Sequence, residues 1–196
     1  MFYDHVSGCG GNLPQIRLQL SRWVKGGRLI KLHKGLYTLS EAYRKIKPEP
    51  FSIANRLQSA SYVSLQSALA WYGLIPEFVP LVTSVTTGRP RLIETPMGRF
   101  DFRHINKSFF WGYQQIELTA GQTAFIARPE KAMLDLVHLT PGGDKEDFIE
   151  GLRAQNIEQI DKAVLRKFSE RSQSPKLKRA FQNIERIIDR GQGIEL

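Results

Sequence analysis

The segment Lys47-Pro48-Glu49-Pro50 divides the chain, because two prolines stand there two residues apart. Each proline disfavours helical geometry in the residue that precedes it, so a continuous helix through this point is not expected. The 196 residues are enough for one or two compact units with a hydrophobic core. We therefore predict a domain boundary here, with one unit at residues 1–47 and a larger unit at residues 48–196.

The positive charge of the chain is concentrated before this boundary. The whole chain has a formal net charge of +9 and a pI near 9.8. Residues 1–47 hold nine Lys and Arg but only two Asp and Glu, whereas the remaining 149 residues hold 19 basic and 17 acidic side chains. Such local concentration is typical of a surface that binds the phosphates of a nucleic acid.

The sequence after Asn12 predicts a helix over Leu13–Lys25. Asn12 can cap it, Pro14 lies in the first turn, and Gly26-Gly27 can end it. At 3.6 residues per turn, one arc of this helix is apolar. That arc contains Leu13, Ile16, Leu20, Trp23 and Val24. The opposite arc mixes Gln, Ser, Arg and Lys, which can hydrogen-bond base edges or phosphates.

Residues 28–39 form two β-prone runs around a turn at His33-Lys34-Gly35. A Gln- and Arg-rich helix followed by a basic hairpin is the order of a winged helix-turn-helix. The motif needs a further helix upstream, yet about eleven residues precede this one, and Gly8, Gly10 and Gly11 form helix poorly. The first helix is thus expected to be truncated, irregular or replaced.

We expect double-stranded DNA to bind at this segment, with three helix residues nearest the bases and the others on phosphates. The base-contacting residues would be Gln15, Gln19 and Arg22. The phosphate-contacting residues would be Arg17, Ser21, Lys25, Arg28, Lys31, His33 and Lys34. A palindromic operator would require two copies on DNA, from a monomer or a weak dimer.

The second unit reads as helices, then strands, then helices. Short helices are expected at residues 51–57 and 65–72, the latter capped by Ser64. About five strands of a mixed or antiparallel sheet follow, at residues 81–87, 91–95, 99–105, 113–118 and 122–127. Further helices are expected at residues 129–139, 144–155, 157–171 and 174–190. The fold class is therefore α+β (mixed α/β), with an N-terminal winged helix-turn-helix.

Few residues of the second unit suggest chemistry. Glu94 and Asp101 flank a hairpin turn and suggest a metal-dependent nuclease, although such carboxylates more often lie opposite arginines such as Arg99 and Arg103. The run Arg128-Pro129-Glu130-Lys131 is more typical of helix capping and ion pairing than of catalysis. We expect no catalytic residue and no cofactor. A single cysteine, Cys9, and four histidines without metal-binding spacing also predict no metal site.

A second basic group lies near the C-terminus, and it could contact DNA flanks or an acidic partner, although a solvated helix face is the default. It comprises Arg166, Lys167, Arg171, Lys176, Lys178 and Arg179. A third reading of the chain is a protein-interaction module whose basic helix binds an acidic protein. The absence of a signal-like start and of a long apolar run predicts a cytoplasmic protein that does not enter membranes.

Five blocks of the sequence, in order, resemble the AbiEi antitoxins. They are QLSRWVKGGRLIKLHKGLY (19–37), SYVSLQSALAWYGLIP (61–76), TSVTT (83–87), ETPMGRF (94–100) and ARPEKA (127–132). The resemblance implies a type IV toxin–antitoxin or phage-resistance system. It implies an N-terminal winged helix that represses its own promoter by binding inverted repeats, with DNA contacts at residues 15–25 and 31–34. It also implies neutralisation of a nucleotidyltransferase-like toxin without a stable complex.

Overall fold

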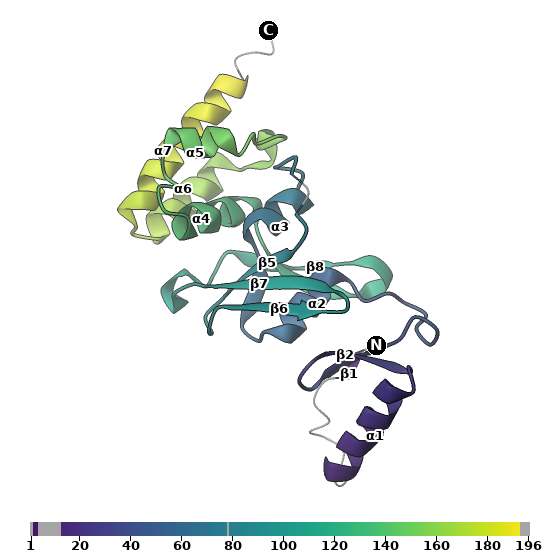
Figure 1. Cartoon of the computed structure of the whole chain (residues 1–196). Coiled ribbons are helices and arrows are strands. Elements are labelled where there is room, and N and C mark those ends of the chain that lie inside the picture. The colour runs from purple at the N-terminus through teal and green to yellow at the C-terminus, as the bar shows by residue number, and fades with distance from the viewer. Residues whose placement is uncertain (1, 4–12, 78, 193–196) are drawn as a thin grey trace.

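The fold consists of two β-sheets with helices at both ends of the chain (Figure 1). The structure is a computed structural model that describes residues 2–3, 13–77 and 79–192. Its mixture of helices with two sheets confirms the predicted α+β class. In the described part of the chain, no helix is both long and apolar enough to cross a membrane.

The first sheet belongs to the basic N-terminal segment. It contains β1 (Phe2–Tyr3), β2 (Leu29–His33) and β3 (Leu36–Leu39) in the order β1-β3-β2, all antiparallel. Helix α1 spans Leu13–Lys25, as predicted. Residues 4–12, where an upstream helix was in question, lie outside the described residues. The complete winged helix-turn-helix therefore stays a prediction.

The second sheet has six strands among the described residues, in the order β6-β7-β5-β4-β9-β8. These strands are β4 (Ser61–Val63), β5 (Val82–Thr86), β6 (Arg91–Thr95), β7 (Gly98–His104), β8 (Tyr113–Glu117) and β9 (Thr123–Ala127). The pairs β4–β9 and β5–β7 are parallel and the others antiparallel, so the sheet is mixed. The central strand β4 was not predicted.

Helices cover both faces of the second sheet (Figure 1). Helix α2 (Pro50–Leu57) packs on one face, against β4, β5 and β9. Helix α3 (Leu65–Trp71) packs against β5 and against α4 (Pro129–Leu139) on the other face. Short 3-10 turns lie at η1 (Lys107–Phe109) and η2 (Thr119–Gly121). The core between these layers contains the fully buried Tyr62, Phe100 and Phe102.

The C-terminal helices form a further layer against α4. They are α5 (Glu146–Gly151), the 3-10 turn η3 (Ile157–Gln159), α6 (Lys162–Arg171) and α7 (Pro175–Gln192). We expected helices at 144–155 and 157–171, but the observed helices α5 and α6 are shorter. Asn156 adopts a left-handed φ of 48°, and the Asp161 carboxylate accepts hydrogen bonds from the amides of Ala163 and Val164. A left-handed φ of 47° at Arg153 also follows the end of α5, so the left-handed residues interrupt the helix and Asp161 restarts it at Lys162.

The β2–β3 hairpin packs against the edge of the second sheet. Leu32 and Leu36 are buried in the same hydrophobic cluster as Ile93 of β6. The segment between the two sheets is also held, because Gln122 accepts a hydrogen bond from the Glu49 amide (3.0 Å) and donates one to the Lys47 carbonyl (2.9 Å). The proline-containing segment therefore connects the two sheets in a fixed path rather than as a loose linker.

Candidate nucleic-acid interface

Helix α1 presents a polar face to solvent. Every helix residue predicted to contact DNA is exposed: Gln15, Arg17, Gln19, Ser21, Arg22 and Lys25. The predicted apolar arc is half-buried at Ile16, Leu20, Trp23 and Val24, whereas the side chain of Leu13 lies outside the described residues. Leu18 is an exception on the polar side, since 53% of its surface is exposed. The amphipathic pattern of α1 is confirmed for these four apolar residues.

The end of α1 is fastened to the hairpin that follows. Gly27 adopts a φ of 69°, in the left-handed region that favours glycine, and the Arg28 amide donates to the Trp23 carbonyl at 2.9 Å. The Ser40 hydroxyl, just after β3, donates to the Gly27 carbonyl at 2.6 Å. These bonds fix the angle at which α1 leaves the three-stranded sheet.

The β2–β3 hairpin has apolar side chains on both faces and an open tip. On one face, Leu29 and Leu39 line an apolar hollow together with Trp23 of α1. On the other face, Leu32 and Leu36 belong to the core shared with the second sheet. The tip turns at Lys34-Gly35, where Gly35 has a φ of 83°. The hairpin can therefore offer a ligand its tip and its exposed side chains.

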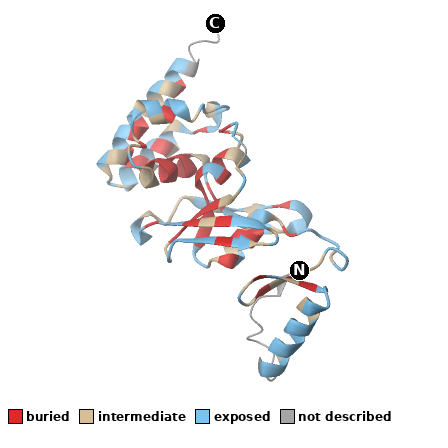
Figure 2. Cartoon of the chain, viewed as in Figure 1, coloured by how far each residue is buried: buried red, intermediate tan, exposed pale blue. Residues whose placement is uncertain are grey.

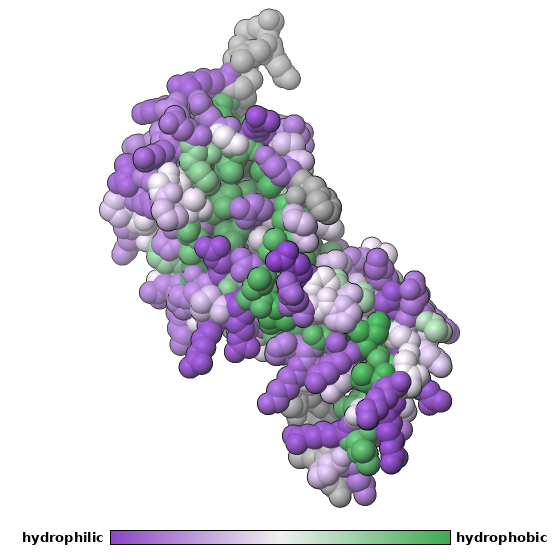
Figure 3. Space-filling model, viewed as in Figure 1, coloured by the Kyte–Doolittle hydropathy of each residue, from purple (hydrophilic) through white to green (hydrophobic). Residues whose placement is uncertain are grey.

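The basic residues of the hairpin remain accessible. Arg28, Lys31 and Lys34 are exposed and His33 is half-buried. Among the described residues before position 48, Arg44 has an ion-pair partner, Glu41 at 4.0 Å. In the part of the chain that the structure describes, no acidic side chain forms an ion pair with Arg17, Arg22 or Lys31. Figure 3 shows hydrophilic side chains over much of this region, with an apolar stripe between them. The cations without a described acidic partner provide the positive charge that an anionic ligand requires.

The carboxylates that suggested a nuclease are occupied by arginines. Glu94 forms an ion pair with Arg99 at 3.2 Å, and Asp101 forms one with Arg103 at 3.8 Å. Within the described ranges, no group of three or more His, Cys, Asp and Glu side chains is placed to hold a metal ion. Cys9 and His5 lie outside those ranges.

Most of the second basic group is engaged within the C-terminal helices. Arg166 pairs with Glu185 at 3.1 Å and Arg179 with Asp144 at 2.8 Å. Lys176 donates to the carbonyls of residues 138 and 140, and the Arg171 guanidinium lies 4.7 Å from the centre of the Trp111 ring. Lys167 and Lys178 are exposed without a described acidic partner. Four of the six residues thus stabilise helix packing.

A buried polar cluster joins α4 to β4, and it was only half anticipated. Lys131 forms an ion pair with Asp135, one helical turn away, and both are 1% exposed. Asp135 also accepts hydrogen bonds from the hydroxyls of Tyr62 (3.0 Å) and Ser64 (2.8 Å). We expected the Ser64 hydroxyl to cap α3. It does not, because it donates its hydrogen bond to Asp135 instead.

The surroundings of this cluster favour a structural role. Burial, together with the negative charge of Asp135, raises the pKa of Tyr62 well above its ordinary value. The Lys131 ammonium lies 4.9 Å from the centre of the Trp111 ring, and Glu130 accepts a hydrogen bond from the Asp161 amide at 3.0 Å. Ion pairing was predicted for the run Arg128-Pro129-Glu130-Lys131. The partner Asp135 was missed, although its i, i+4 spacing from Lys131 on an apolar helix was a signal.

Comparisons with known proteins leave the family open: no protein-family model matches the chain, and no curated protein matches it either.

Proposed function

We propose that the protein is a sequence-specific DNA-binding repressor that places α1 in the major groove of its operator. The observation that carries the proposal is the exposed polar face of α1, on which six Gln, Ser, Arg and Lys side chains face solvent while the apolar arc packs inward. An α-helix fits the major groove, and Gln and Arg are side chains that make bidentate contacts with bases there.

The roles of the side chains follow from their positions. Gln15, Gln19 and Arg22 recur at intervals of three and four residues, so they share one side of the helix and would reach base edges. Arg17, Ser21 and Lys25 would contact phosphates beside them. Arg28, Lys31, His33 and Lys34 would hold the backbone from the hairpin, as the wing of a winged helix does.

The biological setting of this proposal rests on the five sequence blocks that resemble the AbiEi antitoxins. On that basis the protein acts in the bacterial cytoplasm, binds inverted repeats in its own promoter as two copies, and counteracts a nucleotidyltransferase-like toxin without a stable complex. The DNA-binding part can be tested without reference to the toxin.

The experiment is a mobility-shift titration of the full chain on its own upstream promoter fragment and on a random fragment of equal length, at two salt concentrations. We expect the promoter to be preferred by about a hundredfold or more. Arg22→Gln should remove most of that preference. Lys167→Gln, an exposed lysine on α6, is the matched control and should leave it unchanged.

Equal, weak and steeply salt-dependent binding to both fragments would contradict sequence-specific repression. The same titration addresses the competing readings. Cleavage of DNA that requires Mg²⁺ and is lost in Glu94→Ala would favour a nuclease. Displacement of DNA by an acidic protein at physiological salt would favour a protein-interaction module.

A further inference from the structure

Residues 48–196 contain a second local surplus of positive charge, apart from the one on the C-terminal helices. Residues 88–107 hold five of the 19 basic side chains in this part and two of its 17 acidic ones. In the other basic stretch, on the C-terminal helices, most of the cations are engaged by acidic groups, carbonyls or a ring. The stretch at residues 88–107 comprises β6 and β7, at the edge of the six-stranded sheet.

Within the stretch, the side chains at one end of the β6–β7 hairpin are not neutralised. Arg99 and Arg103 pair with Glu94 and Asp101. Arg89, Arg91 and Lys107 are exposed and have no described acidic partner. The Nδ1 of His104 donates to the Gly88 carbonyl at 2.8 Å, which ties the loop before β6 to the end of β7. We call Arg89, Arg91, His104 and Lys107 the basic rim.

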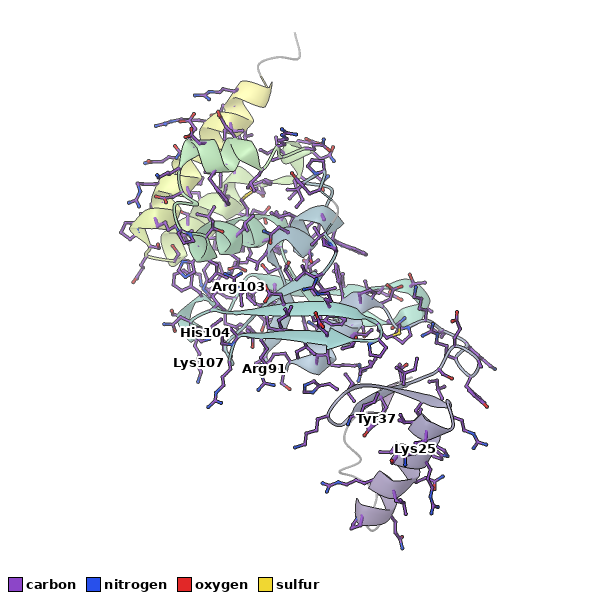
Figure 4. All side chains as sticks on the ribbon, viewed as in Figure 1. Lys25, Tyr37, Arg91, Arg103, His104 and Lys107 are labelled. Carbon is purple, nitrogen blue, oxygen red and sulfur yellow. The ribbon has the colours of Figure 1, made fainter. Side chains whose placement is uncertain are left out.

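The basic rim lies beside the N-terminal hairpin. Strand β2 packs against β6, and Leu32 and Leu36 share a core with Ile93. Figure 4 shows Arg91, His104 and Lys107 at the end of the β6–β7 hairpin that lies on the same side as the turn of the β2–β3 hairpin. The shared core and the two hydrogen bonds of Gln122 to the connecting segment fix this arrangement.

We propose that the basic rim is a second DNA-contacting surface, which binds phosphates that flank the bases read by α1. This inference rests on the proposed function and extends it to the larger unit. Three of the four rim residues are long cationic side chains, which suit regularly spaced backbone phosphates and give no sequence preference. Because the rim and the hairpin are fixed together, a duplex held by one is presented to the other.

The test compares two charge-matched double variants in the full chain. Arg91→Gln/Lys107→Gln removes two charges from the rim, and Lys167→Gln/Lys178→Gln removes two from exposed positions on α6 and α7. Affinity for the promoter fragment is measured over a series of salt concentrations. The slope of log K against log salt is negative, and each lost phosphate contact reduces its magnitude by about 0.9. The slope of the rim variant should therefore be shallower by about two units.

Three further results are expected. The control variant should keep the slope of the unaltered chain, and both variants should keep the ratio of promoter to random binding. Hydroxyl-radical footprints of the rim variant should lose protection in the flanks and keep it over the repeats. On a duplex trimmed to the repeats, the rim variant and the unaltered chain should bind equally.

The inference is overturned if the rim variant matches the control in slope and footprint. That outcome leaves the proposed function intact when Arg22→Gln still removes most of the promoter preference. If the unaltered chain shows no promoter preference, the proposed function fails, but the slopes on the random fragment still decide whether the rim binds phosphates. Urea midpoints of both variants, equal to that of the unaltered chain, establish that the comparison concerns folded proteins.

Discussion

The α1–hairpin segment and the C-terminal helices are both rich in basic residues, but they use them differently. In the C-terminal helices, Arg166, Arg179 and Arg190 lie within 3.2 Å of acidic oxygens on other elements. On α1, Arg17 and Arg22 face solvent without a described acidic partner. Both regions hold several basic residues, so the presence of a partner, rather than the number of cations, separates a packing surface from a ligand-binding one.

Helix α1 and helix α4, on which the C-terminal helices pack, also differ in burial, as Figure 2 shows. Helix α4, at the base of the C-terminal layer, is buried at every position from Glu130 to Val137. Helix α1 has no fully buried side chain among its described ones. A helix packed on one side only gains less from burial, but it keeps a wide face for a partner.

The largest effect should follow from breaking the buried ion pair. Lys131→Met leaves the Asp135 carboxylate buried without its cation, and should lower the free energy of unfolding by about 3–5 kcal/mol. Urea unfolding measures this. Arg166→Gln, which breaks an exposed pair, should cost at most about 1 kcal/mol. An equal loss of unfolding free energy in the two variants would contradict the distinction between buried and exposed ion pairs.

The next effect separates base readers from phosphate binders within the α1–hairpin segment. Arg22→Gln should weaken binding by about 1–3 kcal/mol and relax the preference at one operator position. Lys31→Gln should weaken all sequences alike and reduce the salt slope by about one. Binding to a library of single-base operator variants checks both. A uniform loss in the Arg22 variant would place that side chain on the backbone.

A smaller effect concerns the connection between the two regions. Gln122→Ala removes the hydrogen bonds to the Glu49 amide and the Lys47 carbonyl, and should cost about 1–2 kcal/mol. Limited proteolysis should then cleave residues 40–49 faster, since their backbone is less restrained. Gln115→Ala, at an exposed position of β8, should leave the cleavage rate unchanged. Similar cleavage rates in the unaltered chain, Gln122→Ala and Gln115→Ala would show that the hydrophobic contact of the hairpin alone fixes residues 40–49.

The smallest effect should be a pH dependence that belongs to α4, on which the C-terminal helices pack. Burial lowers the pKa of His138, so the unfolded chain binds a proton there more readily than the folded one. Its contribution to stability is complete above about pH 6.5 and is lost as the pH falls through the lowered value. His138→Phe retains the ring stacked on Phe109 and should flatten the urea midpoint between pH 7 and pH 5. An unchanged profile would assign the acid sensitivity to other groups.

Several elements could be predicted because local sequence decides them. Pro129 at the start and an apolar run define α4, and the glycines at 26 and 27 end α1 where expected. Strand β4 could not be found in this way. It has three residues and all are buried, so it shows no alternation of apolar and polar side chains. The parallel pairing of β5 with β7 likewise depends on the fold as a whole.

The sequence by itself determined where the positive charge lies and which faces of α1 are apolar and polar, because both depend on residues close together in the chain. Only the tertiary structure decided which charges stay available and what lies beside the hairpin. Arg166 is neutralised by Glu185, 19 positions away, and Leu32 packs in one core with Ile93. Ion pairing and burial depend on distance in space, which the fold sets and the local pattern does not.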